Sequence, residues 1–189
     1  MTWYKRLFDI LLSFGLIVCL VPVYLAIACA VKITSKGPVL HWSKRVGRRN
    51  KLFWMPKFRS MKVDTPQIAT HLLRDPRNYL TPIGSFLRRT SLDELPQLVT
   101  IFRGNMTCVG PRPALFNQDD LVNLRTEYGV NLLVPGLTGW AQVNGRDELP
   151  IPEKVRFDRE YLLRRSLLFD IAIIGRTAFK AMAQPWVHH

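Results

Sequence analysis

Asp93 and Glu94 are adjacent carboxylates in a strongly basic chain, and they follow Arg88 and Arg89 by only a few residues. The 189 residues hold 27 Lys and Arg against 14 Asp and Glu, a formal net charge of +13. Such a balance predicts an acidic partner: a nucleic acid, an anionic lipid or a phosphorylated substrate. Because acids are scarce here, two side by side indicate a specific chemical or structural role.

A structural role is available because residues 91–94, Ser-Leu-Asp-Glu, have the S-x-x-E pattern of a helix capping box. Acids in a first helical turn also complement the helix dipole. Pro96 leaves two registers open: with Ser91 as N-cap the proline would cost a helical hydrogen bond, whereas with Asp93 as N-cap it would lie in the first turn. In both registers Asp93 is at or near a helix start, where backbone N–H groups attract phosphate, so the capping and chemical interpretations are compatible.

Two further segments place arginines in restricted backbone. Pro111 and Pro113 fix the chain around Arg112, so its guanidinium is expected to be aimed; a surface-turn arginine is the alternative. Residues 135–146, PGLTGWAQVNGR, predict a glycine-rich loop with close backbone approach to a ligand. Arg146 at its end suits bidentate phosphate contact, and a loop with a structural Trp is the alternative.

Residues 10–31 are a run of 22 residues without a charge. As a helix the run would be about 33 Å long, enough to cross a bilayer. Basic residues flank both ends, so a straight span would place one flank outside, against the positive-inside rule. Because Pro22 predicts a kink, we expect a re-entrant helix that bends at Val21-Pro22 and keeps both chain ends cytoplasmic; a single-pass span is the alternative. Asp9 is expected to pair with Lys5.

Residues 44–62 hold eight basic residues and no acidic one, interleaved with aromatic residues. This pattern fits a nucleic-acid groove with stacking platforms, or a membrane surface where aromatic side chains settle among headgroups. We favour the membrane because of the neighbouring apolar run. Residues 162–186 have apolar residues at helical spacing with basic residues around them, which fits an amphipathic helix in a membrane interface or an ordinary core helix.

The remaining segments predict shorter elements. Residues 95–102 have helical spacing that Gly104 ends, residues 106–109 are expected to form a short strand, and residues 116–128 a helix. Residues 64–78 are polar with two prolines and predict a loop with a short helix.

The expected fold is mainly α with short β elements. It comprises a Pro-kinked re-entrant membrane helix with basic flanks (1–36) and a compact cytoplasmic α/β domain with interfacial amphipathic helices (37–189). The three cysteines and four histidines have no metal-ligand or disulfide-framework spacing, which fits a reducing, cytosol-facing environment.

Four motifs run through the chain: KFRSM at 57–61, SLDELPQL at 91–98, VGPRP at 109–113 and the glycine-rich residues 135–146. With the kinked apolar N-terminus, and with Ser166 and Asp170 in the tail, they resemble the bacterial sugar transferase family, the monotopic phosphoglycosyl transferases. The resemblance covers nearly the whole chain, at the length of the small single-domain members. Thr100 and Asn105 depart from the family pattern, which usually has Asn and Asp there.

The resemblance implies a Mg²⁺-dependent reaction in which a UDP-sugar and polyprenyl (undecaprenyl) phosphate give polyprenyl-diphosphate-sugar and UMP. This is a first membrane step of glycoconjugate or polysaccharide assembly, at the cytoplasmic face of the bacterial inner membrane. It implies that Asp93 attacks the β-phosphate to form a phosphosugar–aspartate intermediate, and that Mg²⁺ binds at Asp93 and Glu94. The expected partners are UDP-sugar, polyprenyl phosphate and membrane lipid, with no nucleic acid.

The chemistry of the residues agrees with this expectation. A carboxylate nucleophile splits a phosphoryl transfer into two steps, and Mg²⁺ favours one or two carboxylates together with phosphate oxygens. The residues expected to hold the diphosphate are Arg88, Arg112 and Arg146, with Lys57 and Arg59 as weaker candidates.

A different class of function stays open, a non-catalytic, membrane-tethered basic module that binds nucleic acid or anionic lipid. It explains the charge and the aromatic residues but neither Asp93-Glu94 nor the proline-framed Arg112. The role of Glu94 is also open, as base, metal partner or cap, and so are the sugar, the pathway and the oligomeric state.

Overall fold

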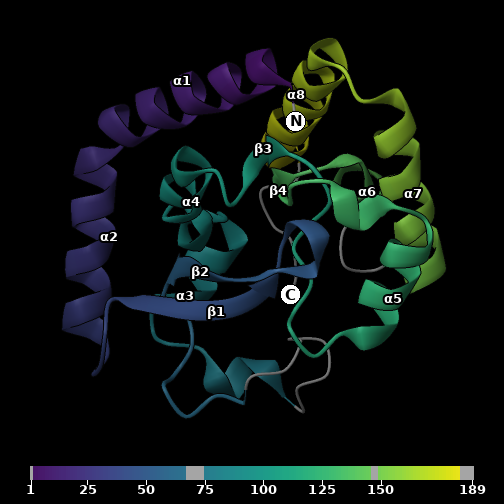
Figure 1. The fold of residues 1–189 in the computed structure, drawn as a ribbon. Helices are drawn as coiled ribbons and strands as arrows, with labels where there is room; N and C mark the ends of the chain where they lie inside the picture. Colours follow the sequence, from purple (N-terminus) through teal and green to yellow (C-terminus); the bar gives the residue numbers. More distant parts are fainter. Residues whose placement is uncertain (1, 67–74, 146–148, 184–189) are drawn as a thin grey trace.

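The computed structural model describes residues 2–66, 75–145 and 149–183, and it is mainly helical with four short strands among these residues. The strands form two separate two-stranded sheets (Figure 1). The expectation of a mainly α chain with short β elements is therefore confirmed.

The N-terminal apolar run forms two helices, α1 (Trp3–Cys19) and α2 (Val21–Thr34), which meet at Leu20 with a bend of 62° (Figure 1). Pro22 lies in the first turn of α2, where its missing N–H costs no helical hydrogen bond. The kink predicted at Val21-Pro22 is thus present. Among the described helices none is long and apolar enough to cross a bilayer alone, whereas α1 and α2 together meet that test of length and composition as a bent pair.

Helix α1 buries polar side chains and exposes apolar ones, the reverse of a helix on the surface of a water-soluble domain. Asp9 and Ser13 are completely buried, whereas Trp3, Leu11 and Phe14 are exposed. Asp9 accepts hydrogen bonds from Thr107 Oγ1 at 2.6 Å and from the Cys108 backbone N–H at 3.0 Å. Helices α1 and α2 also expose seven other large apolar side chains: Tyr4, Leu7, Leu16, Val18, Val21, Leu25 and Ile33.

The predicted pairing of Lys5 with Asp9 is wrong. Lys5 Nζ lies 2.5 Å from Asp170 Oδ2 and also donates to the carbonyl of Val109 at 3.1 Å. The Tyr161 hydroxyl shares its single proton between Asp170 Oδ1, at 2.7 Å, and the same Val109 carbonyl, at 3.0 Å. A surface i,i+4 pair is worth little, so the buried hydrogen bonds available to both residues across the fold determine their partners.

The basic, aromatic residues 44–62 contribute to a hairpin of β1 (Leu40–Val46) and β2 (Leu52–Phe58), joined through the 3₁₀ helix η1 (Arg48–Asn50). The strands are antiparallel, with Leu40 opposite Phe58 and Val46 opposite Leu52. Met55 and Phe58 point into the core, while Trp42 and Trp54 are exposed. A 3₁₀ turn, η3 (Pro76–Tyr79), follows later in the chain.

The carboxylate segment lies between two short helices, α3 (Gly84–Arg89) and α4 (Gln97–Arg103). It forms a 3₁₀ turn, η4 (Leu92–Glu94). The predicted capping box is absent: Ser91 has φ 57° and makes no side-chain cap bond, and Pro96 is the residue that precedes α4. Because proline lacks an N–H, it begins a new helix here instead of continuing the first.

Helix α4 ends as predicted at Gly104, which has φ 91°. The predicted strand follows as β3 (Thr107–Val109), which pairs in parallel with β4 (Gly136–Thr138). The connection between them contains α5 (Asp119–Glu127), within the predicted helix, and η5 (Val130–Leu132).

The predicted glycine-rich loop is instead β4 followed by helix α6 (Trp140–Asn144). Its glycines serve backbone packing: a Cβ on Gly136 would lie 2.1 Å from the Gly110 nitrogen, and one on Gly139 would lie 2.1 Å from the Gly110 oxygen. These two close approaches are between chain segments, and approach to a ligand stays a prediction.

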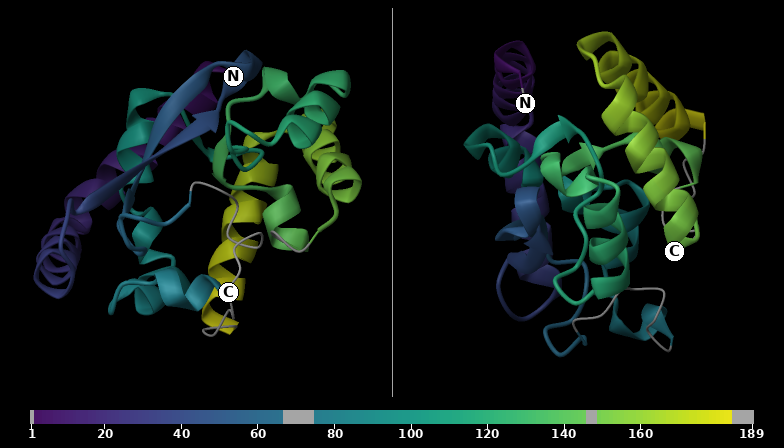
Figure 2. Two further views of the ribbon diagram at one scale, coloured as in Figure 1. Left: turned by 90° about the horizontal axis from the view of Figure 1, so that it is seen from below. Right: turned by 45° about the vertical axis from the view of Figure 1, so that its right-hand side comes forward.

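The C-terminal region forms α7 (Ile151–Arg164) and α8 (Leu167–Ala183), which are seen in the right-hand view of Figure 2. Ser166 Oγ accepts a hydrogen bond from the Phe169 N–H at 3.1 Å and so begins α8. One face of α8 is a core face with Ile173 fully buried, and another face exposes Leu168 and Phe179. Core and surface features therefore coexist on this helix.

The largest hydrophobic cluster joins the hairpin, α4, β3, α6, α7 and α8 in one core. Its buried members are Met55, Leu98, Ile101, Met106, Cys108, Val109, Val143, Tyr161 and Ile173. Thr100, one of the two departures from the family pattern, is buried in α4, and its carbonyl accepts the N–H groups of Asn105 and Met106. Both departures thus contribute to the turn between α4 and β3.

Candidate active site

Asp93 and Glu94 are held on η4, which contacts both α3 and strand β2. Asp93 is only 6% exposed. The left-handed backbone of Ser91 turns the chain between α3 and η4, a conformation that is uncommon for residues other than glycine. The turn therefore brings two acids to the end of the hairpin instead of into the first turn of a longer helix.

Glu94 joins two cations from distant parts of the chain. Its Oε1 accepts a hydrogen bond from Lys57 Nζ at 2.7 Å and from Arg112 Nη2 at 2.9 Å. Lys57 comes from β2 and Arg112 from the proline-framed segment after β3. The fold thus brings together four of the residues selected from the sequence, Asp93, Glu94, Lys57 and Arg112, which we call the carboxylate cluster.

The two carboxyl groups differ in their electrostatics. Burial raises the pKa of Asp93, which the positive charges of Lys57, Arg88 and Arg112 oppose and the charge of Glu94 reinforces. Burial would also raise the pKa of Glu94, but Arg112 and Lys57 outweigh it and lower the pKa well below its usual value. Lys57 Nζ is 3.8 Å from Asp93 Oδ2, farther than from Glu94. Of the two acids, Glu94 is therefore the one whose surroundings favour the ionised form.

The remaining predicted cations have different positions. Arg88 in α3 contributes positive charge at Asp93, and its Nη1 lies 3.1 Å from Met61 Sδ. Arg59 is 3% exposed, and its guanidinium donates to the carbonyls of Ser35 and Lys36 at the end of α2. These hydrogen bonds give Arg59 a place at the helix terminus, outside the carboxylate cluster. Arg146 lies outside the described residues.

Sequence reasoning missed two charged residues near the Arg112 segment, Arg125, which contacts it, and Asp158, which pairs with Arg125. Arg125 on α5 donates from Nη1 to the Arg112 carbonyl at 2.8 Å. It also donates from Nε and Nη2 to Asp158 Oδ2 on α7, at 2.9 and 2.6 Å. Arg125 and Asp158 are 33 residues apart, so no local sequence pattern predicts that they pair. Only the packing of α5 on α7 brings them together.

In the described ranges, no group of three or more His, Cys, Asp or Glu side chains could hold a metal ion. The carboxylate cluster offers two carboxylates in sequence. Mg²⁺ is commonly held by one or two carboxylates, with phosphate oxygens and waters as its other ligands. The donor set of the cluster therefore fits a metal that arrives together with a phosphorylated substrate.

The family profile of the bacterial sugar transferases matches residues 1–184. The chain belongs to this family. Because the match runs through α1, the carboxylate cluster and α8, the N-terminal helices are part of the family unit.

Named relatives agree with this assignment. The chain is 44% identical over 185 residues to a UDP-glucose:undecaprenyl-phosphate glucose-1-phosphate transferase of Escherichia coli, covering 93% of this chain and 39% of that protein. It is 43% identical over 192 residues to the protein of the same name in Xanthomonas campestris, covering 95% and 39%. The exopolysaccharide production protein ExoY of Sinorhizobium fredii is 33% identical over 190 residues, with 92% and 83% covered. The chain thus spans about two fifths of the length of the first two relatives.

Proposed function

We propose that this protein transfers a sugar phosphate from a UDP-sugar to undecaprenyl phosphate, and releases UMP. The carboxylate cluster carries the proposal: a buried aspartate beside an ionised glutamate, with Lys57 and Arg112 within ion-pair distance. Relatives named as UDP-glucose and undecaprenyl-phosphate phosphotransferases support the substrate classes. The cations suit a diphosphate because phosphoryl transfer depends mainly on positioning and charge neutralisation.

In the first step, a carboxylate oxygen of Asp93 attacks the β-phosphorus of the UDP-sugar. The bond from that phosphorus to the bridging oxygen breaks, and its electron pair leaves with UMP. In the second step, a phosphate oxygen of undecaprenyl phosphate attacks the same phosphorus. The acyl–phosphate bond breaks, Asp93 is regenerated as a carboxylate, and the product is an undecaprenyl-diphosphate-sugar.

Arg112 and Lys57 hold the diphosphate oxygens in this mechanism, with Arg88 contributing charge at the nucleophile. A bidentate guanidinium suits the negative phosphate oxygens, and the Lys57 ammonium acts as a point charge between the acids and the substrate. Lys57 and Arg112 lie beside the acids, so a diphosphate that they bind has its β-phosphorus close to Asp93.

The role of Glu94 is to organise the two cations and a metal ligand position. Its lowered pKa makes it a poor proton acceptor near neutral pH, and the absent capping box removes the cap role. Asp93 and Glu94 would hold Mg²⁺, which would supply neutralisation of charge on the diphosphate oxygens.

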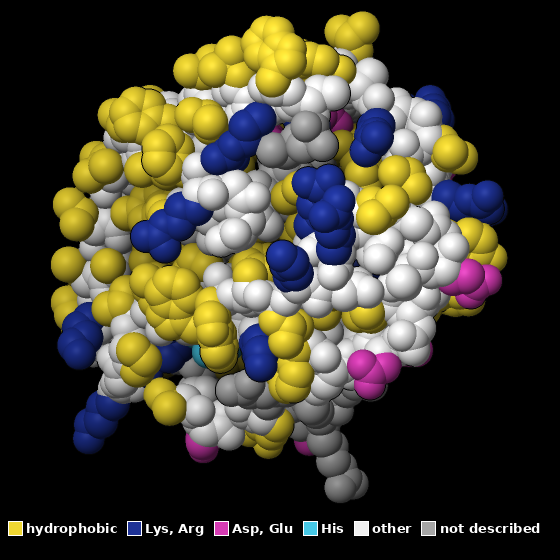
Figure 3. Space-filling view, viewed as in Figure 1, with side chains coloured by type: hydrophobic (Ala, Val, Ile, Leu, Met, Phe, Trp, Pro, Cys, Tyr) yellow, Lys and Arg dark blue, Asp and Glu magenta, His cyan; other side chains and the backbone are white. Residues whose placement is uncertain are grey.

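The same proposal places α1 and α2 in the membrane as a re-entrant hairpin at the cytoplasmic face of the bacterial inner membrane. Helix α1 buries its polar residues and exposes its apolar ones, which is the reverse of a helix that faces water. Figure 3 shows hydrophobic side chains gathered over α1 and α2, with Lys and Arg side chains over the neighbouring face. This arrangement suits an apolar layer bordered by anionic headgroups.

A panel of UDP-sugars tests the function. The purified protein in lipid nanodiscs is incubated with Mg²⁺, undecaprenyl phosphate and each UDP-sugar, and UMP and the lipid product are detected by mass spectrometry. We expect UMP and one lipid-linked sugar in equal amounts with at least one donor. Failure with every donor, together with binding to anionic vesicles or nucleic acid, would support the non-catalytic module instead.

A further inference from the structure

The segment that carries Arg112 is held by hydrogen bonds to three consecutive backbone carbonyl groups. The Pro111 carbonyl accepts from the Gly136 N–H at 2.9 Å, the Arg112 carbonyl from Arg125 Nη1 at 2.8 Å, and the Pro113 carbonyl from Arg45 Nη1 at 3.2 Å. Prolines at 111 and 113 have no N–H to donate. The position of the segment thus depends on donors from β4, α5 and β1.

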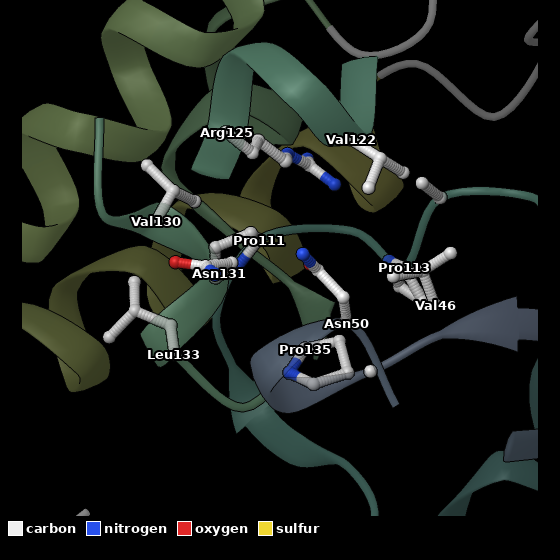
Figure 4. A pocket seen from close by; sticks show the side chains of 12 residues that line it. Val46, Asn50, Pro111, Pro113, Val122, Arg125, Val130, Asn131, Leu133 and Pro135 are labelled. Atoms are coloured by element: carbon white, nitrogen blue, oxygen red, sulfur yellow. The ribbon is translucent and has the colours of Figure 1, made fainter. Parts of the chain in front are cut away.

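Arg125 is the donor to Arg112, the residue of this segment that belongs to the carboxylate cluster. Figure 4 shows it reaching from α5 into a small hollow that Pro111 and Pro113 also line. The Arg125 side chain is 9% exposed, and the Asp158 side chain that pairs with it is 2% exposed. A chain of contacts therefore runs from Asp158 through Arg125 to the Arg112 backbone, and from the Arg112 side chain to Glu94 at 2.9 Å.

A buried ion pair is not required for stability alone, because well-packed apolar residues of similar volume are often as stable. An apolar pair would, however, leave the Arg112 carbonyl without its donor. The planar fork of arginine can bond one carboxylate and one carbonyl in fixed directions, which the single ammonium of lysine does not reproduce. The geometry thus suits a role in positioning the Arg112 backbone better than a role in filling the core.

We propose that Arg125 and Asp158 are positioning residues that set the Arg112 guanidinium for the sugar-phosphate transfer. The inference rests on the proposed function and adds two residues that do not contact the substrate. Loss of the pair shifts the backbone at Arg112, and small displacements of a group that binds the transferring phosphate lower the rate strongly. The effect on catalysis is therefore transmitted through Arg112.

A double-mutant cycle tests this. Arg125→Lys and Arg112→Lys are made singly and together in the full chain, and kcat/KM for the UDP-sugar is measured. We expect Arg125→Lys to lower kcat/KM by about 10-fold in the wild-type background and by less than about twofold when Arg112 is already Lys. Equal losses in both backgrounds would overturn the inference while leaving the transferase function intact.

Asp158→Asn repeats the cycle from the other side of the pair, and Asp170→Asn is its matched control. Both replace a buried, ion-paired aspartate by its isostere, but Asp170 pairs with Lys5 on α1. We expect Asp158→Asn to be non-additive with Arg112→Lys and Asp170→Asn to be additive. Thermal unfolding of each variant accompanies the kinetics, and failure of both Arg125→Lys and Asp158→Asn to fold would mark a structural role and overturn the inference.

Binding of UDP with Mg²⁺, measured by calorimetry across the same variants, separates this inference from the function. Coupling of Arg125 to Arg112 in UDP affinity, with a wild type that transfers no sugar phosphate, would support the positioning role and reject the proposed reaction. Neither turnover nor UDP binding in the wild type would reject both.

Discussion

Two clusters of charged side chains in this protein differ in how completely their members are paired with one another. In the carboxylate cluster Glu94 Oε1 is shared by two cations, while Asp93 is 3.8 Å from the nearer of them. In the group that joins α1 to the core, Lys5, Asp170, Tyr161 and the Val109 carbonyl form a closed set of hydrogen bonds. We call this second set the anchor network.

The two sets differ in how their charges are balanced. Burial raises the pKa of Tyr161, with Asp170 adding to the rise, so the hydroxyl stays neutral; it donates within the network and accepts from Lys5 Nζ at 3.3 Å. In the carboxylate cluster the pKa values of neighbouring acids are displaced in opposite directions, which is typical of catalytic carboxylate pairs. The anchor network joins α1 to the core, whereas an unequal pair of acids beside three cations suits the anionic substrate that we propose.

Asp93→Asn should have the largest effect, a loss of more than about 1,000-fold in UMP release, because the amide cannot form the acyl-phosphate bond. The midpoint temperature of thermal unfolding should be unchanged or slightly higher, since a buried carboxyl is replaced by a neutral isostere. Membrane association should be unchanged. Turnover near the wild-type rate in this variant would remove Asp93 from the mechanism.

Arg112→Lys should lower kcat/KM by about 100-fold, because a lysine keeps the charge but loses the bidentate contact to phosphate and the hydrogen bond to Glu94. Steady-state kinetics with the UDP-sugar measure it. Arg156→Lys, on an exposed ion pair of α7, is the control and should change nothing. Equal activity of the two variants would show that Arg112 does not bind the reacting phosphate.

The pH profile of kcat/KM should show an acid limb above the usual range of an aspartate. The reactive form is the carboxylate, and burial raises the pKa of Asp93, so activity falls as pH drops through that raised value. Lys57→Gln removes the largest opposing charge and should move the limb further to alkaline pH, with a loss of about 10-fold at neutral pH. A limb that moves to lower pH, or does not move, would contradict this assignment.

Asp170→Asn should have the smallest effect on chemistry and the clearest effect on stability. It leaves Lys5 without its partner in a largely buried place, and breaking such a pair costs about 3–5 kcal/mol. We expect a lower unfolding midpoint but kcat within about twofold of wild type for the folded protein. A catalytic loss as large as that of Arg112→Lys would erase the distinction between the two sets.

The sequence predicts the features that local chemistry determines. Pro22 predicts the kink because proline does not continue a preceding helix but fits the first turn of a new one. Gly104 predicts the end of α4 because it supplies a left-handed residue. The adjacent acids and the proline-framed Arg112 are local too, and the fold brings them together. Their selection therefore required no knowledge of the tertiary structure.

Other features depend on contacts that spacing does not reveal. Arg59 is two residues from Lys57, but strand β2 ends at Phe58, so the alternation of a strand no longer relates their side chains. Asp9 bonds Thr107, 98 residues away, in preference to its neighbour Lys5. Gly136 and Gly139 approach Gly110 beside the paired strands β3 and β4, which a pattern of single residues cannot distinguish from approach to a ligand.

The most direct test of the account is to trap the first step at Asp93. The protein is mixed with Mg²⁺ and a UDP-sugar without undecaprenyl phosphate, quenched, digested and analysed by mass spectrometry, with Asp93→Asn as the control. We predict a burst of UMP that does not exceed one equivalent per protein, and a sugar-phosphate mass on the peptide at Asp93 that disappears when undecaprenyl phosphate is added. UMP release only when the lipid acceptor is present, with no adduct on Asp93, would contradict the central claim.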